Sequence, residues 1–345
     1  MNFFASRLQY ALLTVLIGLF GAYPLTAQPR QTQRPIDLEM VFYQSAHWKY
    51  VLYGVRDARE TFEDIRLQAV MPGNMTARSH NQAIEAALGS NPRGLAVTVV
   101  HAQDQRETLE RAAAQVPLVT FDWDGPRGLS RTFVGHDEFG HGKLAAELIL
   151  RAADQDTPVH LFTEVGHPWP DLRVRGIRNG LEGSGVSVTA VHDKGQDHDK
   201  TKQQVQQVLA ASDGPLVLIG VWYQNGGAIL QAVRDAGRQH NVKVVCFGIA
   251  PLVKEGIEQG HIVGCVVQDH HRLTVEAVRV LRAHVLGEDP ETTHRGAHAV
   301  RGGIVDAQNL EAYTDYQRSI LENEDGVDFF PFDDNTERDD AQNAD

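Results

Sequence analysis

Residues 118–126 read Leu118-Val119-Thr120-Phe121-Asp122-Trp123-Asp124-Gly125-Pro126, a short apolar run that ends in a carboxylate, an indole, a second carboxylate and a turn. An uninterrupted run of apolar and β-branched residues is typical of a parallel strand that is buried on both faces. Open parallel sheets bind their ligands outside the carboxyl ends of the strands. The stretch therefore predicts a parallel sheet with a polar and aromatic binding site at its carboxyl edge.

Two other apolar runs end in the same way. Asp37–Tyr43 leads to Ser45-Ala46-His47-Trp48, and Leu216–Val221 leads to Trp222-Tyr223-Gln224-Asn225. Acidic and amide side chains bind hydroxyl groups, and flat aromatic rings cover the C–H faces of a sugar ring. The repeated pattern predicts a site for a polyhydroxylated ligand that is spread over several strand ends.

Strands and helices alternate almost without a break from Asp37 to Gly287, and the series restarts near residue 158. The expected strands are 38–43, 65–70, 95–100, 118–121, 159–162, 186–190, 216–221, 243–247 and 262–267. Strict alternation of this kind predicts parallel sheets with helices on both faces. Because there are too many strands for one small sheet, we expect an α/β protein with two Rossmann-like lobes.

The charge of the chain is concentrated in its last residues. Glu322–Asp345 contains ten acidic residues and one basic residue, so this tail carries −9 of the net charge of −13. Such a segment is typical of a solvated, disordered extension, and a role in partner binding stays open. The rest of the chain is nearly neutral and has no basic stripe, which argues against nucleic acid as a partner.

The N-terminus has the order of a secretory signal peptide. Arg7 gives the positive start, Ala11–Phe20 the apolar segment, and Leu25-Thr26-Ala27 a small-residue cleavage site before Gln28. The apolar segment is shorter than the about 20 residues of a membrane-spanning helix. We therefore expect cleavage after residues 1–27 and a soluble, periplasmic protein, with an uncleaved signal anchor as the alternative.

Cys246 and Cys265 are the two cysteines of the chain, so no disulfide framework holds the fold. Both fall in predicted buried strands, where a cysteine usually acts as a small apolar residue. If the two strands are neighbours, an oxidising compartment permits a bond between them. The sequence leaves both states open.

Six segments follow one another in a characteristic order: Ser45-Ala46-His47-Trp48, Val119-Thr120-Phe121-Asp122, Phe133-Val134-Gly135-His136-Asp137, Arg173-Val174-Arg175-Gly176-Ile177, Gly220-Val221-Trp222-Tyr223-Gln224-Asn225-Gly226 and Val263-Gly264-Cys265-Val266-Val267-Gln268. Their order and spacing resemble those of type I periplasmic sugar-binding proteins of the ribose-binding class. In that family the corresponding segments form ligand loops, a ligand-binding Asp, a lobe crossover and a ligand-contacting Gln. The resemblance extends from Asp37 to Tyr313.

The resemblance implies two lobes joined by a three-segment hinge. The expected N-terminal lobe is 37–136 plus 269–297, the C-terminal lobe 137–268 plus 298–315, and the acidic tail 316–345. It also implies that a sugar is captured between the lobes by a monomer and delivered to the membrane subunits of an ABC transporter. The alternative is a sensory protein of the same fold that signals to a membrane receptor kinase.

The chain departs from the family pattern at three places. Cys246-Phe247-Gly248 stands where the family has Gly-Phe-Asp, so a carboxylate that contacts sugar hydroxyls is missing. Gln268-Asp269-His270 replaces Gln-Asn-Pro, and Trp123 replaces an Arg. The resemblance therefore implies altered pocket chemistry, with a ligand site that is either retargeted or weakened.

We expect ten residues to contact the ligand. A carboxylate at a strand tip accepts strong hydrogen bonds from hydroxyls, and a guanidinium grips two oxygen atoms at once. Arg175 and Arg178 are alternatives to Arg173, interlobe packing is the alternative for the tryptophans, and capping is the alternative for the loop residues. The set is Ser45, His47, Trp48, Asp122, Trp123, Asp124, Arg173, Trp222, Asn225 and Gln268.

Signatures of enzymes, cofactors and metals are missing from the sequence. It contains no GxxxxGK[ST], GxGxxG or GxSxG motif, and Asp122 and Asp124 lie too close on one strand tip to flank a glycosidic bond. His136-Asp137 with His141, and His270-His271, have no HExxH or zinc-site spacing. We therefore interpret the sixteen histidines as scattered surface residues and expect no enzyme, no cofactor and no metal.

Overall fold

The computed structural model describes residues 34–45, 47–126, 129, 132–193, 197–290 and 297–322. The predicted signal peptide, Ala46 and the tail after Glu322 lie outside these residues, and the description below concerns the unit that begins at Pro35. Within the described ranges, no helix combines the length and the hydropathy that a transmembrane span requires.

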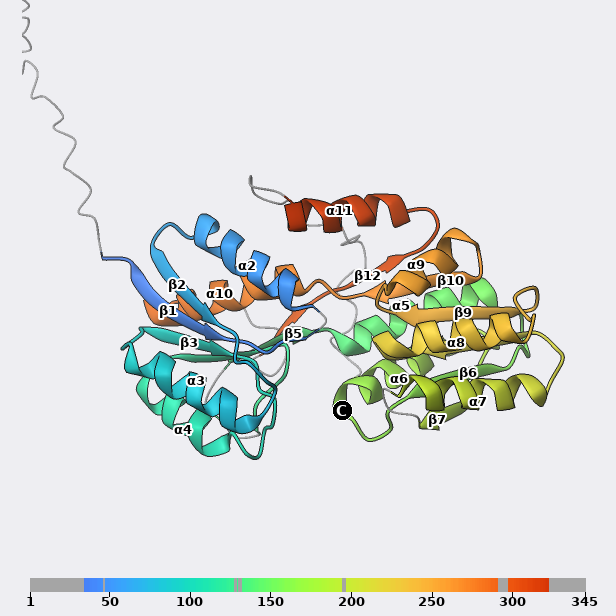
Figure 1. The fold of residues 1–345 in the computed structure, drawn as a ribbon, viewed down its shortest axis with the longest axis horizontal. Coiled ribbons are helices and arrows are strands. Elements are labelled where there is room, and N and C mark those ends of the chain that lie inside the picture. The colour runs from blue at the N-terminus through green and yellow to red at the C-terminus, as the bar shows by residue number, and fades with distance from the viewer. Residues whose placement is uncertain are drawn as a thin grey trace, which may run out of the picture. The chain divides into compact units, whose positions relative to one another are not determined.

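The first lobe is built on a sheet with the strand order β11-β5-β4-β3-β1-β2, in which every pairing is parallel. Its strands are β1 Ile36–Val41, β2 Ile65–Val70, β3 Gly94–Val97, β4 Leu118–Phe121, β5 Thr132–His136 and β11 Ala297–Val300. Met40 packs with helices α2 (Trp48–Thr61) and α10 (His270–Leu286), and Val41 packs with α3 (Ala77–Gly89) and α4 (Arg106–Gln115). Because successive side chains of a strand point to opposite faces, the two helix pairs cover opposite faces of the sheet (Figure 1).

The second lobe has a sheet with the order β12-β10-β9-β8-β6-β7, parallel except for the β10–β12 pair. Its strands are β6 Val159–Thr163, β7 Val188–Asp193, β8 Leu216–Gly220, β9 Val242–Phe247, β10 Ile262–Val267 and β12 Gly303–Val305. Leu218 packs with α7 (His198–Ala210), α8 (Tyr223–Asp235) and α9 (Pro251–Glu258), and Ile219 packs with α5 (Glu138–Ala152) and α6 (Pro168–Gly180). The helices therefore cover both faces here too.

The predicted α/β class with two lobes of parallel strands is confirmed. Four elements are outside the expected series, namely β5, β11, β12 and the final helix α11 (Leu310–Glu322). The three strands have only three to five residues each, and no helix stands between β11 and β12, so the βα alternation does not reveal them.

The chain passes from one sheet to the other at three points, after β5, after β10 and between β11 and β12. The third passage lies at residues 301–302, because Val300 still pairs with His136 in the first sheet. This is later than the expected boundary between 297 and 298. Residues 316–322 belong to α11, so the helix extends beyond the expected start of the tail.

Two of these passages carry an aspartate that starts the next helix. The backbone N–H of Gly140 donates to Asp137 Oδ1 at 2.8 Å, and that of Arg272 donates to Asp269 Oδ1 at 2.8 Å. A carboxylate in this position satisfies backbone donors that have no partner within the helix and interacts favourably with the helix dipole. The caps thereby fix where α5 and α10 begin beside the sheet ends.

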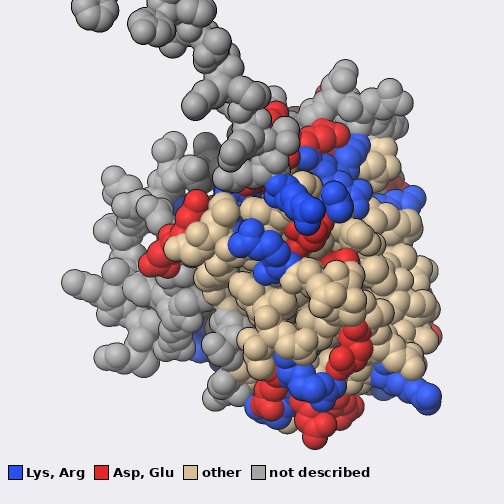
Figure 2. Space-filling view, turned by 90° about the vertical axis from the view of Figure 1, so that its left-hand side faces the viewer, with Lys and Arg blue, Asp and Glu red and all other residues tan. Residues whose placement is uncertain are grey.

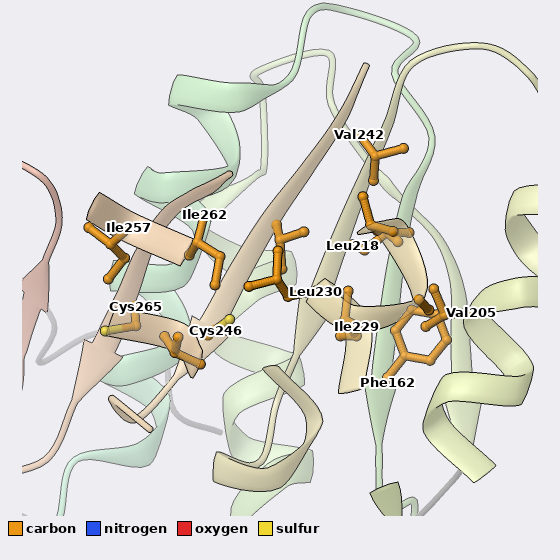
Figure 3. Packing of buried hydrophobic residues seen from close by; sticks show 14 of the residues in the cluster. Phe162, Val205, Leu218, Ile229, Leu230, Val242, Cys246, Ile257, Ile262 and Cys265 are labelled. Atoms are coloured by element: carbon orange, nitrogen blue, oxygen red, sulfur yellow. The ribbon is translucent and has the colours of Figure 1, made fainter. Parts of the chain in front are cut away.

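Cys246 and Cys265 lie opposite each other on the neighbouring strands β9 and β10, inside the apolar cluster of the second lobe (Figure 3). The strands are thus neighbours, and both thiols are free. Burial raises the pKa of Cys246 to about 12, so the thiol is uncharged and behaves as an apolar side chain.

On the face drawn in Figure 2, the described Lys and Arg side chains lie interspersed with Asp and Glu. Ion pairs near the protein surface include Arg282 with Asp64 at 2.7 Å and Arg66 with Asp37 at 3.3 Å. Pairs at a solvent-exposed surface contribute little to stability. The fold therefore depends on the apolar clusters between the sheets and their helices.

Candidate functional site

A cavity of about 590 Å³ is formed by residues that follow strands of both sheets and by one face of α11. Seven of the ten predicted site residues line it, which are Ser45, His47, Asp122, Trp123, Arg173, Trp222 and Gln268. They come from positions up to 223 residues apart in the sequence, and the carboxyl ends of the parallel strands bring them together. The cavity is the candidate ligand site.

Three of the predicted residues, Trp48, Asp124 and Asn225, lie elsewhere. Trp48 packs against the apolar cluster of the first lobe, because it is the first residue of α2 and points to the sheet. Asp124 accepts hydrogen bonds from Thr120 Oγ1 at 3.1 Å and from the backbone N–H of Gly125 at 2.7 Å. Its carboxylate thus holds the loop after β4, which is the capping alternative named for it above.

Asn225 is fully buried beneath the start of α8. Its Oδ1 accepts the backbone N–H of Trp222 at 3.1 Å, and its Nδ2 donates to Thr201 Oγ1 at 3.0 Å. An amide at a strand end could donate and accept hydrogen bonds with a ligand, but the Asn225 amide instead connects α8 to α7. The structure does not bring Asn225 to the cavity.

One wall of the cavity is aromatic. The ring centroids of Trp123 and Trp169 are 4.7 Å apart with an edge-on geometry, and Tyr43 lies 5.4 Å from Trp123. The ring centroids of His167 and Trp222 are 5.3 Å apart. Such a wall offers flat apolar surfaces with polar edges, which is how proteins cover the C–H faces of sugars.

Trp169 was not among the predicted residues. It lies in Pro168-Trp169-Pro170 at the start of α6, six residues after the end of β6 at Thr163. The sequence contains a weaker signal than for Trp123, because Trp169 stands in the loop and helix start after a buried strand and not directly at the strand end. The other cavity residues that sequence reasoning missed include Tyr43, Tyr50, Glu138, Tyr223, Phe247 and His270.

Asp122 points its carboxylate at the cavity from a left-handed backbone conformation, with φ of 61°. Aspartate is among the few residues that tolerate this region. Tyr43 donates its hydroxyl to Asp122 Oδ2 at 2.9 Å. Burial raises the pKa of Asp122 to about 6, and the hydrogen bond from Tyr43 opposes this shift. The carboxylate is therefore a strong acceptor that is already oriented before a ligand binds.

Arg173 is the inward-facing arginine of α6, whereas Arg175 and Arg178 are exposed. Its Nε donates to Glu138 Oε2 at 2.6 Å, and its Nη1 donates to the carbonyl of Val221 at 2.8 Å. Two of its donors are thus engaged within the protein. This arrangement fixes the guanidinium under the aromatic wall, 5.7 Å from the ring centroid of Trp222.

Glu138 is the centre of this buried polar cluster. Besides Arg173, its carboxylate accepts a hydrogen bond from Gln268 Nε2 at 2.9 Å and lies 3.3 Å from Nδ1 of His141. Burial alone would raise the pKa of Glu138, but Arg173 and His141 hold it well below its ordinary value. The negative charge is therefore compensated inside the protein, and the cluster connects α5, α6 and the end of β10.

Three of the four histidines in the two clusters are buried, and His136 is half-buried, so interpreting them as scattered surface residues was wrong. His141, His270 and His271 are at most 8% exposed. The rings of His47 and His270 stack with centroids 4.2 Å apart, and His136 lies 4.8 Å from His270. The signal in the sequence was position, because His136 ends a strand and His270 stands three residues after one.

Gly248 lies in the cavity wall, at the place where the resemblance implies an Asp. Its φ is 75°, and a Cβ at this position would lie 2.5 Å from Cδ2 of Tyr223. The ring of Tyr223 therefore fills the space that a carboxylate would need. The ring centroids of Tyr223 and His47 are 5.4 Å apart with an edge-on geometry, so an aromatic ring stands where the resemblance implies a charge.

The side of the cavity opposite the sheets is formed by α11. Tyr313, Tyr316, Gln317 and Ile320 all line it, and the hydroxyl of Tyr316 donates to Asp269 Oδ2 at 2.7 Å. The helix follows β12 of the second lobe but contacts α2 of the first. A helix beyond the final strand thus contributes to the site.

Comparisons with known proteins agree with this architecture. A family model described as a periplasmic binding protein domain matches residues 39–289. A comparison with curated proteins found no match.

Several solved structures have a similar fold. A sugar-binding protein of a sugar ABC transporter from Bacillus halodurans has 19% identity and a TM-score of 0.71, covering 80% of this chain and 99% of its own. AraP, an arabinose binding protein from Geobacillus stearothermophilus, has 18% identity and a TM-score of 0.71, covering 81% and 99%. An ABC transporter solute binding protein from Burkholderia graminis, in complex with D-arabinose, has 21% identity and a TM-score of 0.68, covering 81% and 98%.

At these identities the solved structures show the fold alone, whereas the family model matches most of the chain. Together with two parallel sheets, three passages between them and a cavity at the strand ends, the match shows that the chain belongs to the periplasmic binding protein family and has its two-lobed type I fold.

Proposed function

We propose that this protein is an exported solute-binding protein that captures a sugar or a similar polyhydroxylated ligand between its lobes and delivers it to the membrane subunits of an ABC transporter. The observation that carries the proposal is the cavity itself. A carboxylate, Asp122, and the rings of Trp123, Trp169 and Trp222 line the same space. Hydroxyl groups and C–H faces of one ligand ring match these two kinds of surface.

The charge of the site argues against an anionic ligand. Glu138 and Arg173 neutralise each other, which leaves Asp122 as an acceptor for hydroxyls and Gln268 as a polar amide. The solved structures of similar fold support the same class of ligand, since they include sugar-binding and arabinose-binding proteins. The aromatic replacement at Gly248 favours stacking over charged contacts in selecting the sugar.

Residues from both lobes already meet across the cavity. Trp123 follows β4 of the first lobe and contacts Trp169 of the second, and His47 contacts Tyr223 in the same way. A ligand that touches both lobes stabilises their closed arrangement, because the open arrangement offers only part of its contacts. Closure would give the transporter a surface that differs between loaded and empty protein.

Export is part of the proposal and has its own measurement. The mature chain recovered from the cell envelope is expected to begin at or near Gln28, and N-terminal sequencing checks this. An intact Met1 on a membrane-embedded product would instead indicate a signal anchor.

The proposed ligand class is tested by thermal unfolding of the purified full chain against a panel of pentoses, hexoses and polyols. A ligand at 100 times its Kd stabilises the native state by about 2.7 kcal/mol, which gives a clear rise in melting temperature. Glycerol at the same concentration controls for non-specific stabilisation. A panel in which no cyclic sugar exceeds glycerol contradicts the proposal.

Delivery is tested separately in the cell. Deleting the gene is expected to abolish uptake of the sugar that the panel identifies. Intact uptake combined with a lost transcriptional response to that sugar would favour the sensory alternative, in which the protein signals to a membrane receptor kinase.

A further inference from the structure

Three side chains with metal-binding atoms meet beside the cavity. Asp122 follows β4, His136 ends β5 and His270 begins α10, and one ligand atom of each lies within 4.8 Å of the others. The strands β4 and β5 are parallel neighbours, and the backbone N–H of Asp122 donates to the carbonyl of Val134 at 2.9 Å. The sheet therefore holds Asp122 and His136 at adjacent strand ends.

His136 lacks a partner within the described part of the chain. Both of its ring nitrogens are buried, and neither has a hydrogen-bond partner. A neutral imidazole carries one donor and one acceptor, and leaving them unsatisfied inside a protein costs free energy. A bound ligand or ion next to the His136 ring would satisfy these nitrogens, which the described residues leave without a hydrogen-bond partner.

The ring of His270 lies in the cavity wall, and the residue is 8% exposed. The backbone of Gln268 is a hydrogen-bond partner of the His270 ring. A contact of this kind fixes which nitrogen of a ligating histidine faces the metal.

The charges around the three residues are compatible with a cation. Arg173 is a positive side chain whose charge repels a cation near His136 and His270. Its charge is compensated by Glu138, whose Oε2 lies 2.6 Å from Arg173 Nε. The carboxylate of Asp122 then supplies a negative charge of its own. His47 stacks on His270 with an angle of 16° between the rings and so supports the orientation of that ring.

We propose that Asp122, His136 and His270 bind one divalent transition-metal ion of the zinc class at the cavity wall. One carboxylate and two imidazoles suit Zn²⁺, Co²⁺, Ni²⁺ or Fe²⁺, whereas Ca²⁺ and Mg²⁺ prefer sets of oxygen atoms. Metal–ligand bonds of about 2.1 Å place the ligand atoms of a tetrahedral site about 3.4 Å apart, so three atoms within 4.8 Å of one another need at most small side-chain rotations to bind one ion. The sequence could not reveal the site, because its ligands are 14 and 134 residues apart.

Three protein ligands leave at least one coordination position open. Asp122 and His270 line the cavity, so this position faces the space that a ligand would enter. An oxygen atom of a bound molecule would then complete the coordination of the metal. The metal site itself does not depend on the proposed sugar function.

The test uses the full chain without a histidine tag, stripped with EDTA and dialysed, and titrated calorimetrically with Zn²⁺ in the absence of sugar. One site per chain is expected, and Co²⁺ is expected to give a visible absorption band from nitrogen and oxygen ligands. His136→Ala and His270→Ala should each weaken Zn²⁺ binding at least tenfold. The matched control is His240→Ala, because His240 is exposed and distant in sequence from the three ligands.

Circular dichroism melting shows whether each variant folds. If His136→Ala does not fold, His270→Ala still tests the site independently. Binding that persists unchanged in a folded ligand variant would overturn the proposal and move the metal elsewhere, for example to the His160–His192 pair, whose nitrogens are 3.0 Å apart. Several weak sites per chain would equally overturn it, as adventitious binding. Since no sugar is present, a chain that binds no sugar still tests the metal site.

Discussion

The ring of Tyr223 occupies the space beside Gly248, so that a Cβ on Gly248 would lie 2.5 Å from Cδ2 of Tyr223. The resemblance to sugar-binding proteins of the ribose-binding class implies an Asp at this place. In this chain the ring of Tyr223 occupies the volume that such a carboxylate would need. The two positions form one aromatic replacement in the cavity wall.

Gly248→Asp is expected to destabilise the protein by about 1–3 kcal/mol, because the new side chain meets both a left-handed backbone and the Tyr223 ring. Gly260→Asp is the matched control, since Gly260 has a similar φ of 71° and a Cβ there would have no atom within 4 Å. Thermal unfolding should show a larger loss for Gly248→Asp, and Tyr223→Ala should relieve it. Equal losses in the two variants would contradict the steric account.

Glu138→Gln is expected to lower stability by about 3–5 kcal/mol, because it leaves the buried Arg173 guanidinium without its counter-charge. Glu110→Gln makes the same change in the exposed pair with Arg106 and should leave the melting temperature unchanged. Urea unfolding of both variants measures the difference. If Glu138→Gln unfolds as the wild type does, the cluster around Glu138 does not organise the site.

Asn225→Ala is expected to lower stability by about 1–3 kcal/mol, since the backbone N–H of Trp222 and the hydroxyl of Thr201 both lose a buried partner. Asn179→Ala is a suitable control, because the Asn179 amide makes an exposed contact with Glu182. Unfolding curves distinguish the two. An Asn225 variant with full stability but weaker sugar binding would restore Asn225 as a ligand residue.

The strand ends were the part of the site that sequence could predict. A buried run that stops at polar and aromatic residues marks the carboxyl edge of a parallel sheet, and this placed Asp122, Trp123 and Trp222 in one cavity. The same signal does not separate ligand contacts from caps. Asp124 and Asn225 have the right chemistry at the right edge, but their hydrogen bonds are made to other groups of the protein.

Other features depend on contacts that no local pattern reveals. Glu138 reads as an ordinary first-turn residue of α5, and its role follows from Arg173 and Gln268, which approach from other elements. The helix α11 lies after the alternating series, so the sequence does not reveal its cavity face. His136 and His270 meet only because two passages between the sheets lie side by side.

The most direct test of the central claim compares two carboxylates that lie two residues apart. Asp122 lines the cavity, whereas Asp124 holds its own loop. Calorimetric titration of wild type, Asp122→Asn and Asp124→Asn with the sugar that gives the largest thermal shift, in buffer with EDTA, isolates the sugar contact from any metal. Losing one charged hydrogen bond costs about 1.5–3 kcal/mol, so Asp122→Asn should raise Kd at least tenfold while Asp124→Asn leaves it unchanged. Equal affinities in all three proteins would contradict a sugar site built around Asp122.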